Sequence, residues 1–600
     1  MKKILLILGI IVLIGAVSIG VFIATFDANS FKPLVSEKLG DALGSRVEIG
    51  DLSLVFRGGI ALAVDSLAIY EHDNLTQAPD LSLKSAYASL KIVPLLKKDI
   101  QVASVMLMKP KIQITRDKNG VIKVRGVNPP PASQDEKLKD STPQTQKAAP
   151  AVSFLIGSIQ ITDGEARYQD EMLQPPVDVT VRDLDVTLKN VSMVKPIAFE
   201  ALMAVFAEKQ NISLKGTISG LEQNAPALKG FTASADLGSF QYVELARSIP
   251  ALRDAGLEEG LAGNVSLSIP SMRIGADGIE EMSANIRLSD GRVAVSQIKA
   301  PVEKIQIAAS YNHPNAAIDT FSASLAGASL DASGTVTDVA NAQDADLKIK
   351  ANMPKLNAFI QSLTGSAPKI DGSLSISLDG AATGLDWPRM SQTLSGAGTM
   401  KLQNGVILDT NIMREVLQKI TFIPGLAAIV EEKLPASVKA KLREDYTLLQ
   451  PIEKNFSIQN GTIALDGLTI ETDLFSLNAD AKATLAGEIN GRGIIRFNKM
   501  VSEAMVNGFS QLSSLQDPEK MVSFPVVFGI SKNATSFMPD LQFIAQKLAA
   551  EKGKELLGDL LKKAQKDGEG EGGEEGESSQ RPSLFDQLLK EALGRSDKSQ

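Results

Sequence analysis

The residue types that most often carry chemistry are scarce in this chain of 600 residues, which has no cysteine and only two histidines. Without cysteine, disulfides, thiolate metal sites and a cysteine nucleophile are excluded. His72 and His313 lie in polar, turn-like sequences, Tyr-Glu-His-Asp-Asn and Tyr-Asn-His-Pro-Asn. Histidine catalysis and most metal sites need imidazoles grouped with other functional side chains, so we expect both histidines to be solvated. No cofactor and no metal are predicted.

Known catalytic motifs are also missing from the sequence. It contains no Gly-x-Ser-x-Gly elbow, phosphate loop or His-Glu-x-x-His, and no carboxylates paired as an acid and base would be. The glycine-rich run 487–493 stands between alternating patterns with no helix after it, which disfavours a phosphate cradle. Asp480 and Glu488 fall on the polar side of strand patterns, where a carboxylate is solvated. We therefore predict that the protein is not an enzyme.

Charge and composition narrow the class further. The chain is 44% hydrophobic and 22% charged, which excludes a wholly disordered chain and a polytopic membrane protein. Its net charge is −8, and the acidic run 567–577 supplies most of it, so the remainder is nearly neutral. Binding to phosphate backbones needs a surplus of lysine and arginine. No nucleic-acid partner is therefore expected.

The N-terminus has the pattern of a membrane anchor. Two lysines precede an uncharged apolar run that ends at Phe26. At about 1.5 Å per residue this run makes a helix of about 34 Å, enough to cross a hydrocarbon core of about 30 Å. The positive end favours a cytoplasmic N-terminus, with the rest of the chain on the far side. A cleaved signal peptide is the alternative, although the run is long for one and no clear Ala-x-Ala site closes it. The residues that define this predicted anchor are Lys2, Lys3, Ile4, Leu13, Phe22 and Phe26.

From Val47 onward the dominant hydrophobic period is two. The runs 373–378 and 477–485 alternate apolar and polar residues without error. This alternation predicts strands with one apolar face and one wet face, which is typical of antiparallel pairing. Asp-Gly and Asn-Gly pairs open many of the runs, and such pairs supply the positive φ of tight hairpin turns. The predicted fold is mainly β: a long, curled antiparallel sheet that forms a β-groove, with an N-terminal transmembrane helix and a few amphipathic helices.

Changes in pattern along the chain suggest domain boundaries. Proline, serine and glutamine cluster in a predicted linker, and helical periodicity appears in two places past residue 410. The predicted parts are an anchor (1–26), an N-terminal α+β module (27–126), a flexible linker (127–150), a central antiparallel β array (151–410), a helical insertion (411–450), a C-terminal β region (451–540), an amphipathic helix (541–566), and an acidic linker with a short terminal helix (567–600).

Several segments resemble the AsmA family. The resemblance covers most of the chain but includes no catalytic motif, so it rests on pattern and order. The similar segments are Phe31-Lys-Pro-Leu34, Leu43 to Leu54, Val93 to Leu107, Pro110 to Gly120 and Ile156 to Asp170, and, for the family's C-terminal region, Leu394 to Leu408 and Phe456 to Phe497. The acidic linker and the last helix depart from the family's pattern, and their role stays open.

The resemblance implies a function as well as a fold. AsmA-like, TamB-related proteins are kin of chorein-type bridge-like lipid-transfer proteins, in which a curled sheet shields acyl chains in a hydrophobic groove. The implied protein is anchored in the inner membrane, lies mostly in the periplasm, and carries or conducts phospholipids toward the outer membrane in support of outer-membrane biogenesis and homeostasis. The expected partners are phospholipid acyl chains and the inner membrane, with outer-membrane or other envelope proteins open as partners of the C-terminal helices.

The residues themselves are compatible with such a groove. Many inward candidates are alanine, serine or glycine, and small side chains would leave a trough open rather than fill it. From the residues alone, a closed and self-filled sandwich competes with this open trough. The predicted lining shares the apolar phase of the clearest strand patterns: Leu374, Ile376, Leu378, Ile463, Leu465, Leu477, Ala479 and Ala481.

Two other functions compete with a lipid conduit. One is an assembly or scaffold factor that acts in outer-membrane protein or lipopolysaccharide biogenesis without holding lipid. The other is an anchored periplasmic hydrolase, for which no catalytic residues were found. The sequence does not specify lipid identity, direction of transport, energy source or oligomeric state.

Overall fold

A computed structural model describes twelve stretches of the chain. These are residues 26–57, 59–71, 78–91, 102–128, 156–223, 225–254, 256–258, 260–275, 278–419, 425–485, 488–530 and 535–549. The predicted anchor except Phe26, most of the predicted linker, His72 and everything after residue 549 lie outside them. Among the described residues, no helix has the length and apolar character needed to cross a membrane. The anchor therefore stays a prediction.

The packing divides the protein into two units. Unit 1 comprises the described residues of Met1–Gln343 and Ser362–Gly365, and unit 2 those of Asp344–Gln361 and Ser366–Gln600. Both units are mainly β, as the alternating patterns predict. The helix α6 (Leu356–Thr364) contains the boundary between them.

Unit 1 begins with a small α+β region. Its elements are η1 (Ala28–Phe31), α2 (Lys32–Leu43), β1 (Arg46–Ile49), β2 (Leu52–Phe56), β3 (Ile60–Val64), β4 (Leu67–Tyr70), β5 (Leu81–Leu83), β6 (Ser85–Leu90), β7 (Val102–Met108), β8 (Lys111–Arg116) and β9 (Ile122–Val124). The helix α2 ends at Gly44, whose φ of 62° is easily adopted only without a side chain. Val35, Leu39 and Leu43 recur at helical spacing and pack on a small core around Ile49. The first helix thus covers the start of the sheet.

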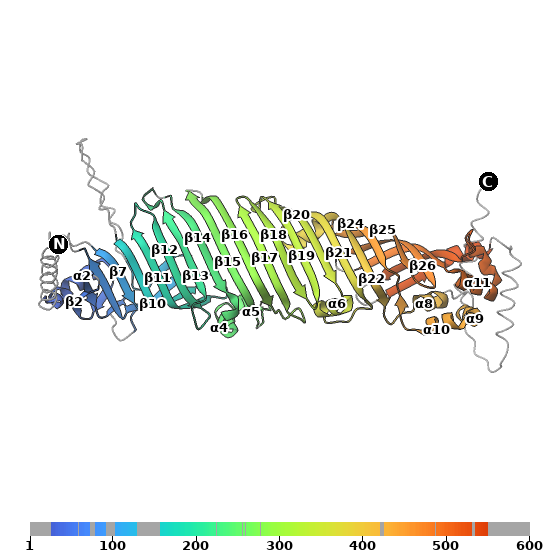
Figure 1. Ribbon diagram of the computed structural model, residues 1–600, viewed down its shortest axis with the longest axis horizontal. Coiled ribbons are helices and arrows are strands. Elements are labelled where there is room, and N and C mark those ends of the chain that lie inside the picture. The colour runs from blue at the N-terminus through green and yellow to red at the C-terminus, as the bar shows by residue number, and fades with distance from the viewer. Residues whose placement is uncertain are drawn as a thin grey trace, which may run out of the picture. The chain divides into compact units, whose positions relative to one another are not determined.

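The rest of unit 1 is a meander of long strands (Figure 1). Its strands are β10 (Ile156–Asp170), β11 (Val177–Val191), β12 (Ile197–Val205), β13 (Ile212–Ser219), β14 (Ala227–Asp236), β15 (Ala262–Gly275), β16 (Gly278–Val293), β17 (Val302–Asn312), β18 (Asn315–Leu325) and β19 (Ala328–Thr337). Each pairs antiparallel with the next. The short helices η2 (Leu221–Gln223), η3 (Leu237–Ser239), α4 (Tyr242–Ser248) and α5 (Pro250–Asp254) lie in its connections, with α4 and α5 at the ends of the strands (Figure 1).

The expectation of purely antiparallel pairing is wrong at one place. β10 runs parallel to β7, where Ser158 faces Ser104, and to β8, where Glu165 faces Lys111. Parallel strands need a connection of about a dozen residues or more, and the chain between β9 and β10 exceeds that length. The sheet of unit 1 is therefore mixed.

Several Asp-Gly and Asn-Gly pairs do not form hairpin turns either. Asp163, Asp290 and Asn404 have φ between 51° and 55°, but they lie inside long strands at shifts of register. They form bulges, which use the same positive φ as tight turns. Asn460 and Gly461, with φ of 49° and 73°, do form the predicted hairpin turn.

Unit 2 is a second antiparallel meander with helices between its strands. Its strands are β20 (Asp344–Met353), β21 (Ile370–Thr383), β22 (Ser395–Ile407), β23 (Thr447–Leu448), β24 (Ile452–Gln459), β25 (Thr462–Glu471), β26 (Phe475–Thr484), β27 (Ile489–Phe497), β28 (Ser523–Ile530) and β29 (Thr535–Pro539). Its helices are α7 (Trp387–Thr393), α8 (Ile412–Lys419), α9 (Leu426–Lys433), α10 (Ala436–Arg443), α11 (Lys499–Gly508) and η4 (Ser510–Leu515). Residues 541–549 continue as a helix after β29.

The largest core of the described residues lies in unit 2, between these helices and the last strands. Ile495, Phe497 and Phe524 on β27 and β28 are at most 1% exposed, and they pack with fully buried Val416 of α8 and Met505 of α11. Ile544, from the start of the predicted C-terminal amphipathic helix, is also fully buried in this core. Helices therefore cover this part of the sheet, and side chains fill the space between them.

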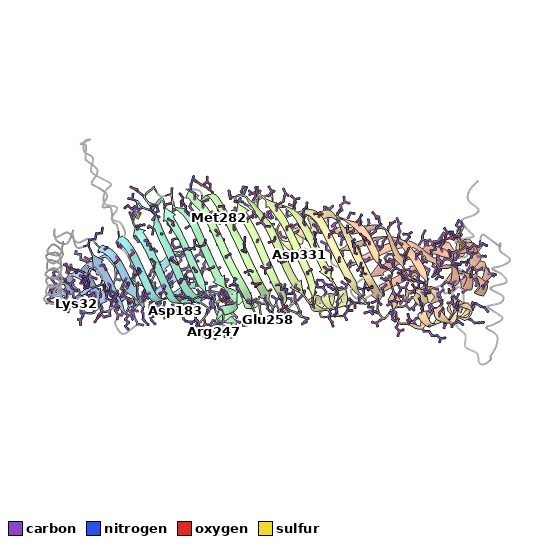
Figure 2. All side chains as sticks on the ribbon, in the orientation of Figure 1. Lys32, Asp183, Arg247, Glu258, Met282 and Asp331 are labelled. Carbon is purple, nitrogen blue, oxygen red and sulfur yellow. The ribbon has the colours of Figure 1, made fainter. Side chains whose placement is uncertain are left out.

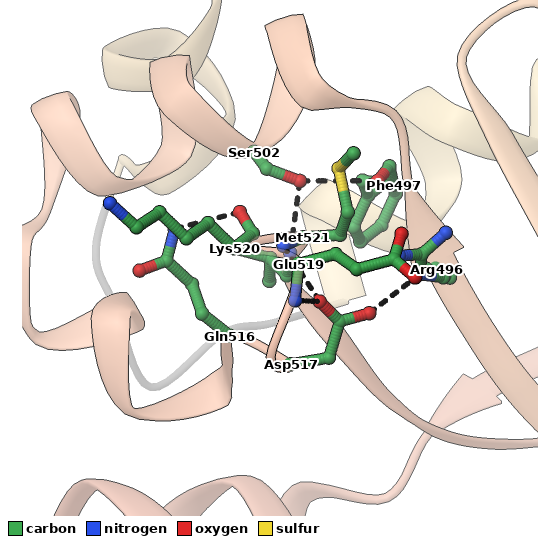
Figure 3. A network of polar contacts seen from close by, with 9 residues as sticks. Arg496, Phe497, Ser502, Gln516, Asp517, Glu519, Lys520 and Met521 are labelled. Atoms are coloured by element: carbon green, nitrogen blue, oxygen red, sulfur yellow. Dashed lines mark hydrogen bonds and ion pairs between the residues drawn. The ribbon is translucent and has the colours of Figure 1, made fainter.

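Polar contacts hold the segment that follows β27 in place (Figure 3). The Ser502 hydroxyl donates to the Phe497 carbonyl at 3.2 Å and accepts from the Val522 amide at 2.9 Å. Asp517 accepts from the Arg496 guanidinium at 2.6 Å and from the Met521 amide at 3.0 Å. The hydrogen bond from Arg496, opposed by partial burial, holds the pKa of Asp517 below its ordinary value. The segment between β27 and β28, which packs over this core, is therefore held by polar contacts near both of its ends.

Candidate functional site

The structure places all eight predicted lining residues on one face of the unit 2 sheet. The register connects them strand by strand. Leu374, Ile376 and Leu378 of β21 face Leu402, Met400 and Gly398 of β22, and Gly398 faces Phe456 of β24. Ile463 of β25 faces Ile458 of β24, while Leu465, Leu468 and Ile470 face Ala481, Ala479 and Leu477 of β26. The shared phase predicted from the sequence holds across five strands, because a bulge between Leu465 and Leu468 keeps both leucines on this face.

The eight residues differ in how far other side chains cover them. Leu477 and Ala479 are each 4% exposed and belong to the closed core beneath the helices. Leu378 is 9% exposed and packs with Ile463 in a smaller cluster that includes Met390 of α7. Ala481 is buried. Leu374, Ile376, Ile463 and Leu465 stay partly exposed. Leu477 and Ala479 thus lie inside filled protein, while the β21 end of the face remains partly open.

A more exposed apolar face lies in unit 1, where no lining residue was predicted. We call it the open face. Its register runs through Ala201 of β12, Leu214 of β13, Ala233 of β14, Leu267 of β15, Ile286 of β16, Ala309 of β17, Ile318 of β18 and Gly334 of β19, with Leu330 in phase on β19. These cross-strand partners are apolar residues or glycine. The open face therefore crosses eight strands without a charged partner in this row.

Large side chains on the open face reach solvent. Ile286 is 48% exposed, Ile318 46% and Leu330 39%. The small residues between them are covered by their neighbours: Ala284 is 6% exposed and Ala323 9%. Isolated exposed apolar residues are ordinary, but a registered row on consecutive strands marks a surface for an apolar partner.

The opposite face of the same strands is polar. Ser213, Ser234 and Ser266 lie in one row with Arg287, and with Gln210 and Asn211 they line a depression of about 440 Å³. A second depression of about 500 Å³ is lined mainly by Asp163, Asp183, Asp185 and Lys209. Figure 2 shows charged side chains such as Asp183, Glu258 and Asp331 around unit 1. The polar and apolar faces of these strands therefore differ sharply in character.

A polar cluster stands at one end of β10, in the phase of the apolar residues. Asp170 is 3% exposed and accepts from Arg116 at 3.3 Å, from the Tyr168 hydroxyl at 2.9 Å and from the Met172 amide at 3.0 Å. Burial alone would raise the pKa of Asp170, but these hydrogen bonds outweigh it, and the pKa lies below its ordinary value. The Tyr168 pKa is raised, chiefly by its hydrogen bond to Asp170. Because the carboxylate stays ionised beside the guanidinium, the cluster is a neutral structural pair.

The described residues offer little for metal or acid–base chemistry. No group of three or more histidine, aspartate or glutamate side chains that could hold a metal ion occurs among them. His313 is exposed in the turn between β17 and β18, as expected, with its Nδ1 2.9 Å from the Tyr311 hydroxyl. The candidate site is the exposed apolar row of the open face.

Clean alternation of apolar and polar residues does not point to the open face. The strands of unit 1 are interrupted by bulges, for example between Ile318 and Phe321, and a bulge breaks the period of two while keeping the face. Ile212, Leu214 and Ile218 on β13 do alternate cleanly. The sequence between residues 156 and 343 lacks long amphipathic helical patterns. This feature could have indicated that no helix covers the apolar face of these strands.

These features define a class: mainly β proteins whose long meandering sheet keeps one apolar face partly uncovered. Residues 1–257 match the model of the AsmA family, and this match confirms the resemblance seen in the sequence for that part of the chain. The resemblance of 394–408 and 456–497 falls outside the matched residues and stays a prediction. No curated protein and no solved structure matches the chain significantly.

Proposed function

We propose that the protein binds phospholipid acyl chains on its open face and carries or conducts them between the membranes of a cell envelope, without catalysing a reaction. The observation that carries this proposal is the registered apolar row of β12–β19, with Ile286, Ile318 and Leu330 each more than a third exposed. The match of residues 1–257 to the AsmA family model supports an envelope role.

The energetics favour a chain-like apolar ligand. Burying one methylene group stabilises by about 0.8 kcal/mol, so an acyl chain of about fourteen carbons gains on the order of 10 kcal/mol if fully sheltered. A row of strands about 4.8 Å apart offers successive equivalent contacts along such a chain. The ligand can therefore move from strand to strand without losing its apolar surroundings.

The sequence predicts how the protein would be oriented in the membrane. The apolar run before Phe26 would anchor the chain in the inner membrane, with both units on the periplasmic side. The start of unit 1 would then be the described part of the chain that lies closest to the inner membrane.

The test is site-specific photo-crosslinking in the full-length chain. A benzophenone side chain is introduced at Ile286 or at Leu330 on the open face, and at the adjacent Arg287 or Asp331 on the polar face. All four positions lie in strands, and Arg287 and Asp331 are exposed. After illumination in membranes, mass spectrometry should find phospholipid adducts at Ile286 and Leu330, and at least about tenfold fewer at Arg287 and Asp331.

Two results would contradict the proposal. Equal lipid adducts in both phases would indicate adsorption to the surface rather than binding to one face. A stoichiometric protein adduct at Ile286 and Leu330 without lipid would instead favour the scaffold function. The pair Ile376 and Ser375 on β21 extends the same test to unit 2, where Ile376 remains partly exposed.

A further inference from the structure

One lysine interrupts the apolar face of unit 2. Lys454 lies on β24 between Ile452 and Phe456 in the apolar phase, and it faces Met400 of β22, which in turn faces Ile376 of β21. Its neighbours in sequence, Glu453 and Asn455, point to the exposed side. Along the described strands β20–β28, the register places no other charged side chain on this face.

The contacts of Lys454 leave its charge uncompensated. Its Nζ donates to the Gly467 carbonyl at 3.0 Å, and among the described residues it forms no ion pair. The adjacent Lys401 points to the other side and pairs with Glu453 at 2.7 Å. An ammonium group has three donors, and one carbonyl satisfies only one of them. Lys454 therefore retains two donors and a full positive charge beside apolar neighbours.

The surroundings explain how the ammonium stays accessible. Gly467 sits in the bulge of β25 with φ of 61°, and its amide donates to Asp480 at 2.7 Å from the opposite side of the sheet. On the other flank the Phe456 ring lies against Gly398, where a Cβ would come within 2.3 Å of it. A flat ring over a glycine and a bulged neighbouring strand leave Lys454 partly exposed.

We propose that Lys454 binds the phosphodiester of a glycerophospholipid whose acyl chains lie on the partly open end of this face, near Ile376 and Leu374. This inference rests on the proposed function and adds a headgroup contact to it. A charge on an apolar face is unfavourable unless it meets water or a counter-charge. A phosphate oxygen supplies the counter-charge through a charge-assisted hydrogen bond, which is about twice as strong as a neutral one. The lysine thus selects phosphate-bearing lipids over neutral ones.

The inference is tested with two acyl-labelled probes, phosphatidylglycerol and a diacylglycerol with the same chains. Purified full-length protein is incubated with vesicles that contain one probe, and the retained label is counted. The wild type should retain phosphatidylglycerol about tenfold better than diacylglycerol. Lys454→Met keeps an unbranched side chain that is one atom shorter, removes the charge and should abolish this preference, whereas Lys454→Arg should keep it. Millimolar inorganic phosphate should not displace the lipid, because it lacks the chains.

Lys482→Met is the matched control, because Lys482 is exposed in the opposite phase of β26 and should leave retention unchanged. If Lys454→Met unfolds the protein, Lys454→Gln, which can still donate to the Gly467 carbonyl, must show the same loss of preference. Retention of both probes by the wild type without preference would overturn the inference alone. Displacement by inorganic phosphate would overturn it in favour of a simple anion site. Retention of neither probe by the wild type would overturn the proposed function, and the inference with it.

Discussion

The open face of unit 1 and the core face of β26–β28 in unit 2 are built from the same kind of strand but meet different surroundings. Ile495 on β27 is fully buried, while Ile286 on β16 is 48% exposed, although each lies in the apolar phase of a long antiparallel strand. The difference lies in the connections. In unit 2 they form helices α8 and α11, which contribute Val416 and Met505 to the core.

In unit 1, the described connections between β11 and β19 do not provide such a cover. Its helices α4 and α5 are short, and Leu245 is the buried residue of α4. An ion pair between Arg182 of β11 and Glu244 of α4 holds that helix at the strands, with a distance of 3.1 Å. The comparison shows that alternation determines which face is apolar, whereas the helical insertions determine whether that face becomes a core or a binding surface.

An aspartate placed on each face should give the largest difference in stability between the two faces. Ile495→Asp puts a carboxylate into a filled core with no partner, and we expect it to destabilise unit 2 by about 4 kcal/mol or more. Ile286→Asp can reach water and should change the stability of unit 1 by about 1 kcal/mol at most. Urea unfolding followed by circular dichroism measures both. The comparison fails if Ile286→Asp is as destabilising as Ile495→Asp.

Truncating an apolar side chain should also destabilise the core face more than the open face, with a smaller difference between the two. Phe497→Ala leaves a cavity among Phe475, Phe524 and their neighbours and should cost about 3–5 kcal/mol. Leu330→Ala, at a side chain that is 39% exposed, should cost about 1 kcal/mol or less, while lowering lipid capture. Thermal unfolding measures the stability of each variant. A large loss for Leu330→Ala would mean that the open face is covered in solution.

The cover itself can be weakened at its polar attachment. Ser502→Ala leaves the buried Val522 amide without an acceptor and should cost about 1–3 kcal/mol. Ser329→Ala, at an exposed site on β19, should change stability by about 0.5 kcal/mol at most. Hydrogen exchange of the Val522 amide reports the effect locally, and unchanged protection in Ser502→Ala would contradict this role.

The smallest expected effect is a dependence on pH. Because Arg496 lowers the folded-state pKa of Asp517, the pair stabilises the fold above the unfolded-state pKa of about 3.9, and this contribution disappears as the pH falls through the lower folded-state value. Asp517→Asn should therefore be less stable than the wild type at pH 7, and this difference should be smaller near pH 2. Melting curves at both values check this, and a constant difference would exclude the ion pair as its source.

Much of the sheet follows from the sequence, and most of what covers it does not. Eight predicted residues share one face because a period of two survives antiparallel pairing, and Asn460-Gly461 forms its turn because both residues accept positive φ. The closure over Leu477 depends on Val501, Met505 and Leu512, which follow it in the chain and whose own pattern does not show which strand they cover. The sequence shows Lys454 within a strand pattern, but only the register of the sheet shows that its neighbours Met400 and Phe456 are apolar.

The parallel contact of β10 has a consequence for the order in which unit 1 assembles. From β11 to β19 each strand pairs with the strand just before it. These strands can therefore pair one after another as the chain emerges, and such local contacts favour fast folding. β10 is different, because its two halves must find β7 and β8 across a long excursion of the chain. That single closure spans the bend between β7 and β8 and joins the N-terminal region to the meander. Because this closure joins residues much farther apart in the chain than the neighbouring-strand pairings do, its loop-closure entropy is larger, and we expect it to form after the local pairings.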